Sequence, residues 1–410
     1  LGYLMLAAGA GVIVSNLDPL GKMIEHGFHI TGVVPNNEAI VAVAQKVLGV
    51  ETMSILVVGL LMNLLIARFT KFKYVFLTGH HSLFMACLMS AVLGTAGLSG
   101  IELILVGGFL MGAWSAISPA IGQSYTSKVT DGDEIALGHF GSLGYYLSAW
   151  VAKYVGKAEE STEDIEIPEK WGFLRDSTLS TALTMIVFYL IAAIAAGSEF
   201  VATLSGSMSP YLFAIMSAMN FAVGVAIVYS GVRMILGDLI PAFQGIATKI
   251  IPNAIPAVDC AVFFTYAPTA VVLGFISSFI GGIIGMLILG AVGGVLIIPG
   301  LVPHFFCGAT AGIYGNATGG RRGAAVGAFL NGLAITFLPA LALPVLGQLG
   351  FQNTTFGDAD FAVIGLVLGN AFEWIGMAGI YGVVVIAALV LIIPNFIKTK
   401  GKVINYVEEE

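Results

Sequence analysis

Three short strings place ionisable side chains within apolar stretches of this sequence. His80 and His81 follow Thr78 in the string TGHH, His139 lies in the string GHF, and Asp259 lies in the string AVDC. An ionisable residue inside a membrane span costs about 2.5 kcal/mol or more unless it is paired or hydrated, so each one is a candidate for a functional site. Imidazoles, a carboxylate and a hydroxyl together supply donors and acceptors, which suits a polyhydroxylated, neutral or weakly acidic solute.

Each of these residues also has a purely structural interpretation. His80 could be a neutral core histidine bonded to a backbone carbonyl, and His139 could cap a surface helix. Asp259 is the sharpest candidate, because its apolar neighbours in the sequence offer no partner and prolines on either side interrupt the helix. We therefore expect Asp259 to contact a substrate or a coupling ion.

The sequence contains none of the motifs expected of an enzyme. It has no P-loop, no dinucleotide fingerprint and no Gly-x-Ser-x-Gly elbow, and no nucleophile and base form a recognisable pair. The cysteines Cys87, Cys260 and Cys307 lack the spacing of a disulfide framework or a zinc site. With 24 acidic and 17 basic residues, the chain also lacks the basic character of a nucleic-acid binder. We expect no catalytic residues, no cofactor and no metal.

The elements that must position these residues are membrane helices. Hydrophobic residues make up 58% of the 410 residues and charged residues only 10%, against about 25% in ordinary globular proteins. We therefore predict an all-α polytopic membrane protein, and because the chain opens on Leu1 inside an apolar segment, we expect an upstream helix to be missing. Besides a remnant at residues 1–14, the predicted spans are Met53–Ala67, Tyr74–Leu93, Ile101–Pro119, Leu179–Ala196, Tyr211–Val232, Thr269–Val292, Gly300–Ala317, Ala324–Leu346 and Phe361–Pro394.

The basic residues indicate how these spans are oriented. If the spans alternate, most Lys and Arg side chains fall on one side of the membrane, which the positive-inside rule assigns to the cytoplasm. These residues are Arg68, Lys71, Lys73, those between Lys128 and Arg175, Arg321, Arg322, Lys398, Lys400 and Lys402. The polar stretch 123–177 is then expected to be a cytoplasmic, amphipathic connector.

Four stretches do not have the pattern of simple spans. Asn16–Val50 contains Pro19 and Pro35, and Arg233–Ile251 has the pattern of a helix lying in the membrane interface. Prolines interrupt Pro252–Pro268, and the run Phe361–Pro394 is too long for one straight span. Since irregular backbone at membrane depth occurs only where protein or a wet cavity surrounds it, these stretches are candidate walls of a substrate site.

Longer strings resemble a known family. LTGHH (77–81), VTDGDEIALGH (129–139), GKAEESTEDIEIP (156–168), DSTLSTA (176–182), AVDCAVFFTYAPTAVVLGF (257–275) and LIIPGLVPHFF (296–306) are similar to the ascorbate-specific membrane component, the C subunit, of the bacterial phosphoenolpyruvate-dependent phosphotransferase system. The resemblance runs from Leu1 to about Lys402. The VTDG and PAVDCA strings are its most specific parts.

The resemblance implies a multi-pass transporter of the bacterial inner membrane with about eleven helices. It implies re-entrant hairpins, amphipathic helices, a core domain and a V-motif domain interleaved in one unit (residues 1–410), inverted repeats, and a homodimer. The substrate, L-ascorbate, would bind between the two domains and cross the membrane. A separate cytoplasmic B subunit, charged through an A subunit, would then phosphorylate it, so this chain would not be an enzyme on its own.

The resemblance also implies which residues contact the solute. Thr78 and His80 match the family's TGH string, His139 matches its GH string, and Asp259 matches its aspartate. The family pattern has glutamines where this chain has Phe84 and Phe140, which removes two amides and leaves a different sugar or polyol open as the substrate. An ion-coupled secondary transporter, in which Asp259 carries the proton or sodium ion, is the alternative.

Overall fold

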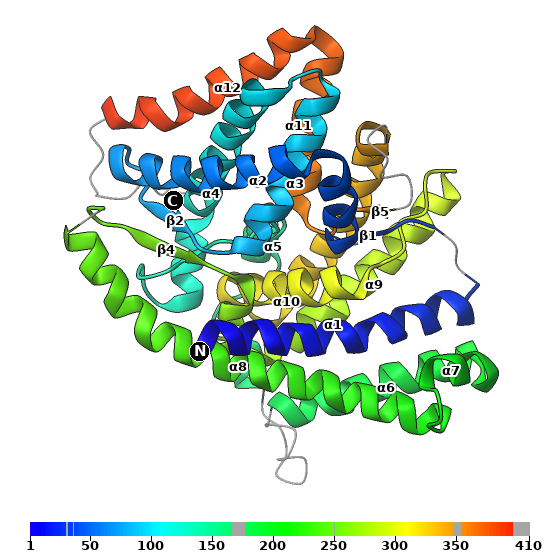
Figure 1. The fold of residues 1–410 in the computed structure, drawn as a ribbon. Coiled ribbons are helices and arrows are strands. Elements are labelled where there is room, and N and C mark those ends of the chain that lie inside the picture. Colours follow the sequence, from blue (N-terminus) through cyan, green and yellow to red (C-terminus); the bar gives the residue numbers. More distant parts are fainter. Residues whose placement is uncertain (30–31, 36, 166–176, 250, 348–353, 397–410) are drawn as a thin grey trace.

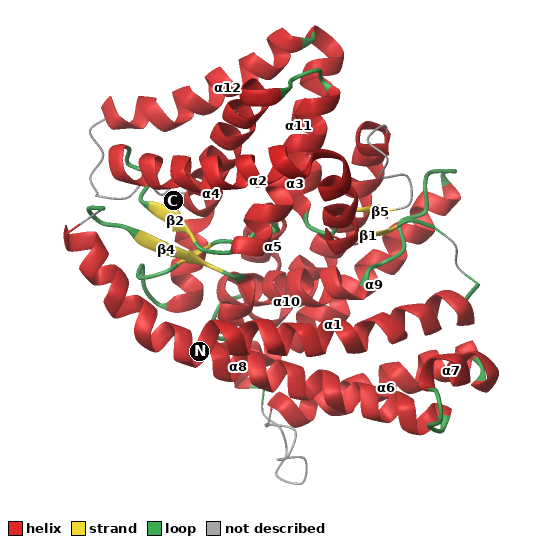
Figure 2. Cartoon of the chain, viewed as in Figure 1, coloured by secondary structure: helices red, strands yellow, loops and turns green. Residues whose placement is uncertain are grey.

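The computed structural model describes residues 1–29, 32–35, 37–165, 177–249, 251–347 and 354–396. Within these ranges helices dominate, and five strands of two to four residues lie among them (Figure 2). Six of the described helices are long and apolar enough to cross a membrane, or seven if the bent pair α6 and α7 forms one span. The chain is a mostly helical polytopic membrane protein, as its composition predicts, and the short strands are an addition to the predicted all-α architecture.

The helices pack around two apolar cores (Figure 1). The first core includes Phe221, Phe263 and Tyr314, and the second includes Met85, Leu103 and Phe361. The helices of the first group are α1 (Gly2–Gly27), α5 (Ser142–Val155), α6 (Ser177–Ala196), α7 (Ser198–Ser205), α8 (Pro210–Lys249), η3 (Cys260–Thr265), α9 (Pro268–Ala291) and α10 (Leu301–Gly347). Those of the second group are α2 (Asn37–Phe69), α3 (Gly79–Thr95), α4 (Gly100–Thr130), α11 (Ala359–Ile375) and α12 (Met377–Ile392), and two short 3-10 turns are η1 (Thr162–Asp164) and η4 (Ile393–Phe396).

Small residues set the closest helix contacts. A Cβ atom on Gly312 of α10 would lie 2.6 Å from the carbonyl oxygen of Ala270 in α9, and one on Gly9 of α1 would lie 2.8 Å from the carbonyl oxygen of Gly224 in α8. Backbones approach this closely in membrane proteins because lipid gives helices no hydrophobic reason to associate, so van der Waals packing must supply the attraction. These contacts join α9 to α10 and α1 to α8.

Short parallel strands join segments that are far apart in the sequence. In one sheet, β4 (Ile255–Val258) lies between β2 (Tyr74–Phe76) and β3 (Ala136–Leu137), and both pairings are parallel. In the other, β1 (Val34–Pro35) pairs in parallel with β5 (Thr354–Thr355), and the neighbouring Val33 forms a parallel bridge with Ile297. Each sheet thus brings together the ends of three helices, and Figure 1 shows β2 and β4 lying apart from β1 and β5.

A short segment, residues 157–165, crosses the break in α10. The backbone of α10 is non-helical at Gly319 and Gly320, and the Arg321 N–H donates to the Glu160 carbonyl across this break at 2.8 Å. The Glu163 carboxylate accepts hydrogen bonds from the N–H groups of Thr269 and Ala270 and from the Thr269 hydroxyl. A carboxylate at this position satisfies free N–H groups at the start of α9 and complements the helix dipole.

We expect Gly320→Ala to destabilise the protein by at least about 2 kcal/mol. Gly320 has a φ of +58°, and a Cβ atom there would overlap the carbonyl oxygens of Lys157 and Glu160. The matched control is Gly382→Ala in α12, where a Cβ atom would meet nothing within 4 Å. Thermal unfolding of the purified variants in detergent measures the difference, and equal midpoints for both would contradict the prediction.

Several predicted boundaries differ from the observed ones. The predicted span 74–93 begins as strand β2, because Tyr74–Phe76 pairs with β4 before α3 starts. Helix α1 continues through Pro19, whose neighbours Leu17 and Leu20 are buried in the first core. The stretch 233–251, predicted as a separate interfacial helix, is for the most part the end of α8, which runs unbroken from residue 210 to residue 249.

The predicted connector 123–177 is not one uniform loop. It contains the end of α4, strand β3, the largely buried helix α5 and the segment 157–165. Gln123 and Thr126 are buried, where the Gln123 amide nitrogen donates to the Ile135 carbonyl and the Thr126 hydroxyl hydrogen-bonds with the Tyr314 hydroxyl. Residues 166–176 of the connector, and the predicted cytoplasmic residues Lys398, Lys400 and Lys402, lie outside the described residues.

Candidate functional site

The carboxyl ends of three parallel strands deliver the predicted site residues to one place. Thr78 and His80 follow β2, His139 follows β3, and Asp259 follows β4. The pairing continues one residue past the strands, since the N–H groups of Leu77 and Gly138 donate to the carbonyls of Ala257 and Val258. The carboxyl ends of parallel strands meet at the same edge of a sheet, where open sheets commonly bind ligands.

His80 and Asp259 form the more accessible part of this site. The Nε2 atom of His80 lies 3.5 Å from an Asp259 carboxylate oxygen, and the two side chains are 55% and 16% exposed. The other oxygen of Asp259 accepts the Ala261 N–H at 3.3 Å and so caps η3. The hydroxyl of Thr78 is buried without a hydrogen-bond partner among the described residues, so it is free to bind a ligand hydroxyl.

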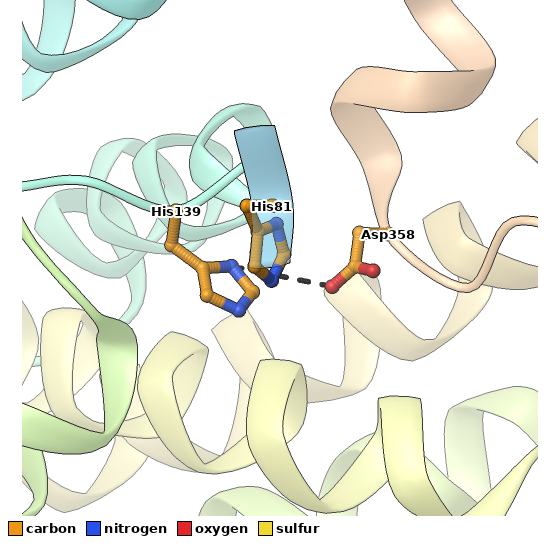
Figure 3. Close-up of side chains that lie close together, drawn as sticks. All are labelled: His81, His139 and Asp358. Atoms are coloured by element: carbon orange, nitrogen blue, oxygen red, sulfur yellow. Dashed lines mark ion pairs between the residues drawn. The ribbon is translucent and has the colours of Figure 1, made fainter. Parts of the chain in front are cut away.

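A second, buried part of the site contains His81, His139 and Asp358 (Figure 3). The rings of His81 and His139 lie 3.7 Å apart, and His139 Nδ1 lies 4.0 Å from an Asp358 oxygen. The Cys307 thiol donates to the same carboxylate at 2.8 Å. Asp358 follows β5 as the N-cap of α11, so the second sheet also contributes to the site.

Backbone N–H groups fix the tautomers of both buried imidazoles. The Phe140 N–H donates to His81 Nδ1 at 3.2 Å, and the Gly141 N–H donates to His139 Nδ1 at 3.1 Å. Since an N–H group can only donate, each Nδ1 must accept, and the proton of the neutral ring therefore lies on Nε2. Burial lowers the pKa of His139, which lies in a connection between helices, and the carboxylates of Asp358 and Asp259 oppose this shift only in part.

This donor set fits a hydrogen-bonded solute better than a metal ion. Ligand atoms of His81, His139 and Asp358 lie within 4.8 Å of one another, as do those of His139, Asp259 and Cys260. A metal ion at Nε2 of either buried ring would require the proton to move to Nδ1, which would break the hydrogen bond from the backbone. With the proton on Nε2, each ring instead offers one N–H donor for a hydrogen bond.

The two phenylalanines at the positions of the family's glutamines border the site in different ways. The Phe84 ring lies 5.7 Å from the rings of both His80 and His81. The Phe140 ring stacks on Phe76 at 4.5 Å and is fully buried, so this residue touches the site mainly through its N–H group.

Asp358 and Asp360 are not among the site residues predicted from the sequence. Asp360 is fully buried and accepts hydrogen bonds from the Trp114 indole, the Ser142 hydroxyl and the Leu143 N–H at 2.7 to 3.1 Å. It therefore ties α11 to α4 and to the start of α5. The sequence feature that points to both residues is the string DAD directly before an apolar run, because two carboxylates there need hydrogen-bond or charged partners.

Comparison with known proteins gives two findings. The family model EIIC-GAT, described as the PTS system sugar-specific permease component, matches residues 1–360, which include every site residue named above. The ascorbate-specific PTS system EIIC component of Mycoplasma pneumoniae is 25% identical over 378 residues, covering 77% of this chain. The chain spans 56% of the length of that relative.

Proposed function

Because this chain belongs to the family of PTS system sugar-specific permease components, we propose that it binds a polyhydroxylated solute and carries it across the bacterial inner membrane. L-ascorbate is the first candidate, because the Mycoplasma pneumoniae relative is described as ascorbate-specific. A separate cytoplasmic B subunit, charged through an A subunit, then phosphorylates the solute. Phosphorylation traps the solute, since a charged ester does not recross the bilayer.

One observation carries this proposal: His80, His139 and Asp259 meet at the carboxyl ends of three parallel strands. The carboxylate accepts hydrogen bonds from solute hydroxyls, and Thr78 adds a hydroxyl that can donate or accept. Phe84 forms an apolar wall beside His80, and the Phe140 N–H orients His81. We assign Thr78, His80, His139, Asp259, Phe84 and Phe140 to the solute site.

The proposed architecture is about eleven spans in a core domain and a V-motif domain, built on inverted repeats and assembled as a homodimer. The order of elements supports the repeats. Two series of elements have the same order of helices and strands. The first is α1, β1, α2, β2, α3, α4, β3 and α5, and the second is α8, β4, α9, the bridge at Ile297, the two parts of α10, β5 and α11. Each series also contributes one strand to the sheet of the other, since β4 lies between β2 and β3, while β1 pairs with β5 and the adjacent Val33 forms a bridge with Ile297.

Uptake into proteoliposomes tests the proposed function. Vesicles that contain the purified protein should accumulate labelled L-ascorbate as its phosphate ester only when a phosphorylated B subunit is present at the face of the membrane that corresponds to the cytoplasm. Vesicles without the B subunit are the control. Accumulation of unmodified solute driven by a proton or sodium gradient would contradict the proposal and would favour the secondary transporter in which Asp259 carries the ion.

A further inference from the structure

We propose that Asn331 is a further solute-binding residue, and that its side-chain amide forms hydrogen bonds with the bound solute. This inference rests on the proposed function and adds a residue to its site. Asn331 lies on the second part of α10, after the break at Gly319 and Gly320, and its side chain is fully buried. The strings that gave the sequence-based site do not include it.

Among the described residues, the Asn331 amide has no hydrogen-bond partner for either its oxygen or its nitrogen. Asn63 and Asn316, which are also buried, are by contrast paired through both amide atoms. Asn63 bonds the backbone of β2, and Asn316 bonds the segment 157–165. A buried polar atom without a partner costs about 1 to 3 kcal/mol, so we infer that the Asn331 amide binds a group from outside the chain.

The position of Asn331 along α10 places it at the depth of a substrate site. It follows Arg321 by ten residues, which in a helix corresponds to about 15 Å, whereas the hydrocarbon core of a bilayer is about 30 Å thick. The positive-inside rule assigns Arg321 to the cytoplasmic end of this span. An amide about halfway across the span cannot reach the water at either membrane surface, and transporters bind their substrates near this depth.

The start of α5 connects this amide to the solute site. A Cβ atom on Gly144 would overlap the amide oxygen of Asn331, and a Cβ atom on Gly141 would lie 3.2 Å from Nδ1 of His139. Gly141 is the N-cap of α5 and Gly144 lies in its first turn. Residues three apart lie on one face of a helix, with Cβ atoms about 5 to 6 Å apart. The amide and the His139 ring therefore meet the same face of α5, close enough for one solute to contact both.

The start of α11 lies beside the same amide. The position of a Cβ atom on Gly144 is 3.8 Å from the Cβ atom of Ala359, the first residue of α11. Asp360, the next residue, accepts hydrogen bonds from the first turn of α5 and so holds the starts of α5 and α11 together. The unpaired amide of Asn331 therefore faces the junction of these two helix starts.

The chemistry of an amide suits the proposed solutes. The Asn331 side chain offers two N–H donors and one carbonyl acceptor without a charge. It can accept from a sugar hydroxyl, and it can donate to a hydroxyl, a carbonyl or an ionised enediol oxygen. The Thr78 hydroxyl, on the other side of the site, is also buried without a partner in the described part of the chain. Both groups can be satisfied when a solute binds.

Asn331→Leu tests this inference, because leucine has a similar shape but no polar atoms. Calorimetric titration of the purified protein with L-ascorbate, xylitol and galactitol identifies the solute that the wild type binds most tightly. Asn331→Leu should bind that solute at least about tenfold more weakly. Without solute, its unfolding midpoint should equal or exceed that of the wild type, because an unpaired buried amide has been removed. Asn63→Leu, which removes a paired amide, should instead lower the midpoint. Asn370→Leu, on a half-buried amide of α11 bonded to its own helix, should bind the solute like the wild type.

A second pair of variants decides if Asn331→Leu cannot be purified. Asn331→Ser and Asn331→Ala leave nearly the same space and differ in one hydroxyl, so the serine variant should bind the solute about threefold or more tightly than the alanine variant. Wild-type affinity in Asn331→Leu, a midpoint lowered as far as that of Asn63→Leu, or equal binding by the serine and alanine variants would each overturn the inference and leave the proposed function standing. A wild type that binds none of the three solutes and shows no uptake with the B subunit would overturn both.

Discussion

Asp259→Asn is expected to weaken solute binding by at least about a hundredfold. The Asp259 carboxylate lies 3.5 Å from His80 and is 16% exposed, so a bound solute would replace most of its remaining water. Two hydrogen bonds to a charged acceptor contribute about 1.5 to 3 kcal/mol each, and the loss of both corresponds to a hundredfold or more in affinity. Calorimetric titration with the preferred solute measures the effect. His80→Ala should also abolish binding, because it removes the partner that orients the carboxylate.

The fold of Asp259→Asn should remain intact, which separates a binding role from a structural one. The structural hydrogen bond that Asp259 accepts, from the Ala261 N–H, can pass to the amide oxygen of asparagine. The unfolding midpoint and the oligomeric state of both variants should therefore equal those of the wild type. Full binding in both Asp259→Asn and His80→Ala would remove these residues from the site.

Asp360→Ala is expected to destabilise the protein by about 3 to 5 kcal/mol. Asp360 is fully buried, and its substitution would leave the Trp114 indole, the Ser142 hydroxyl and the Leu143 N–H without their acceptor. Each buried donor left without a partner costs about 1 to 3 kcal/mol. Thermal or chemical unfolding in detergent measures the loss.

Two control variants test this explanation. Trp114→Phe removes a single donor and should cost only about 1 to 2 kcal/mol. Asp164→Ala removes an exposed carboxylate and should change stability by less than about 0.5 kcal/mol. If Asp360→Ala were as stable as Asp164→Ala, the carboxylate would not hold α4, α5 and α11 together.

The sequence predicted the membrane helices well, because their apolar composition is a local property. The break between the spans 300–317 and 324–346 appears at Gly319 and Gly320, and the long run 361–394 divides at Gly376. The unbroken length of α8 was not predicted, because a change from apolar to mixed residues at 233 also fits a new helix in the interface. Tertiary packing decides between one continuous helix and a separate interfacial helix, and the hydrophobic pattern of the sequence does not show that packing.

The candidate site was predicted in part. The buried or half-buried positions of His139 and Asp259 agree with the energetic argument that ionisable groups in apolar stretches need partners. The meeting of His139 with Asp358 could not be predicted, since 219 positions separate them in the chain and they follow strands of two different sheets, β3 and β5. The strands themselves have two to four residues, which is too few for an alternating pattern to appear.

The exchange of strands between the two halves of the chain constrains how the protein can be made. During synthesis the ribosome releases β2 and β3 long before β4, and β1 long before β5. Neither sheet can close on a nascent chain that ends before residue 258, and Asp358 joins the cluster only when almost the whole described chain has been inserted. Helices that have already entered the bilayer therefore cannot complete both sheets until the last third of the polypeptide has been synthesised.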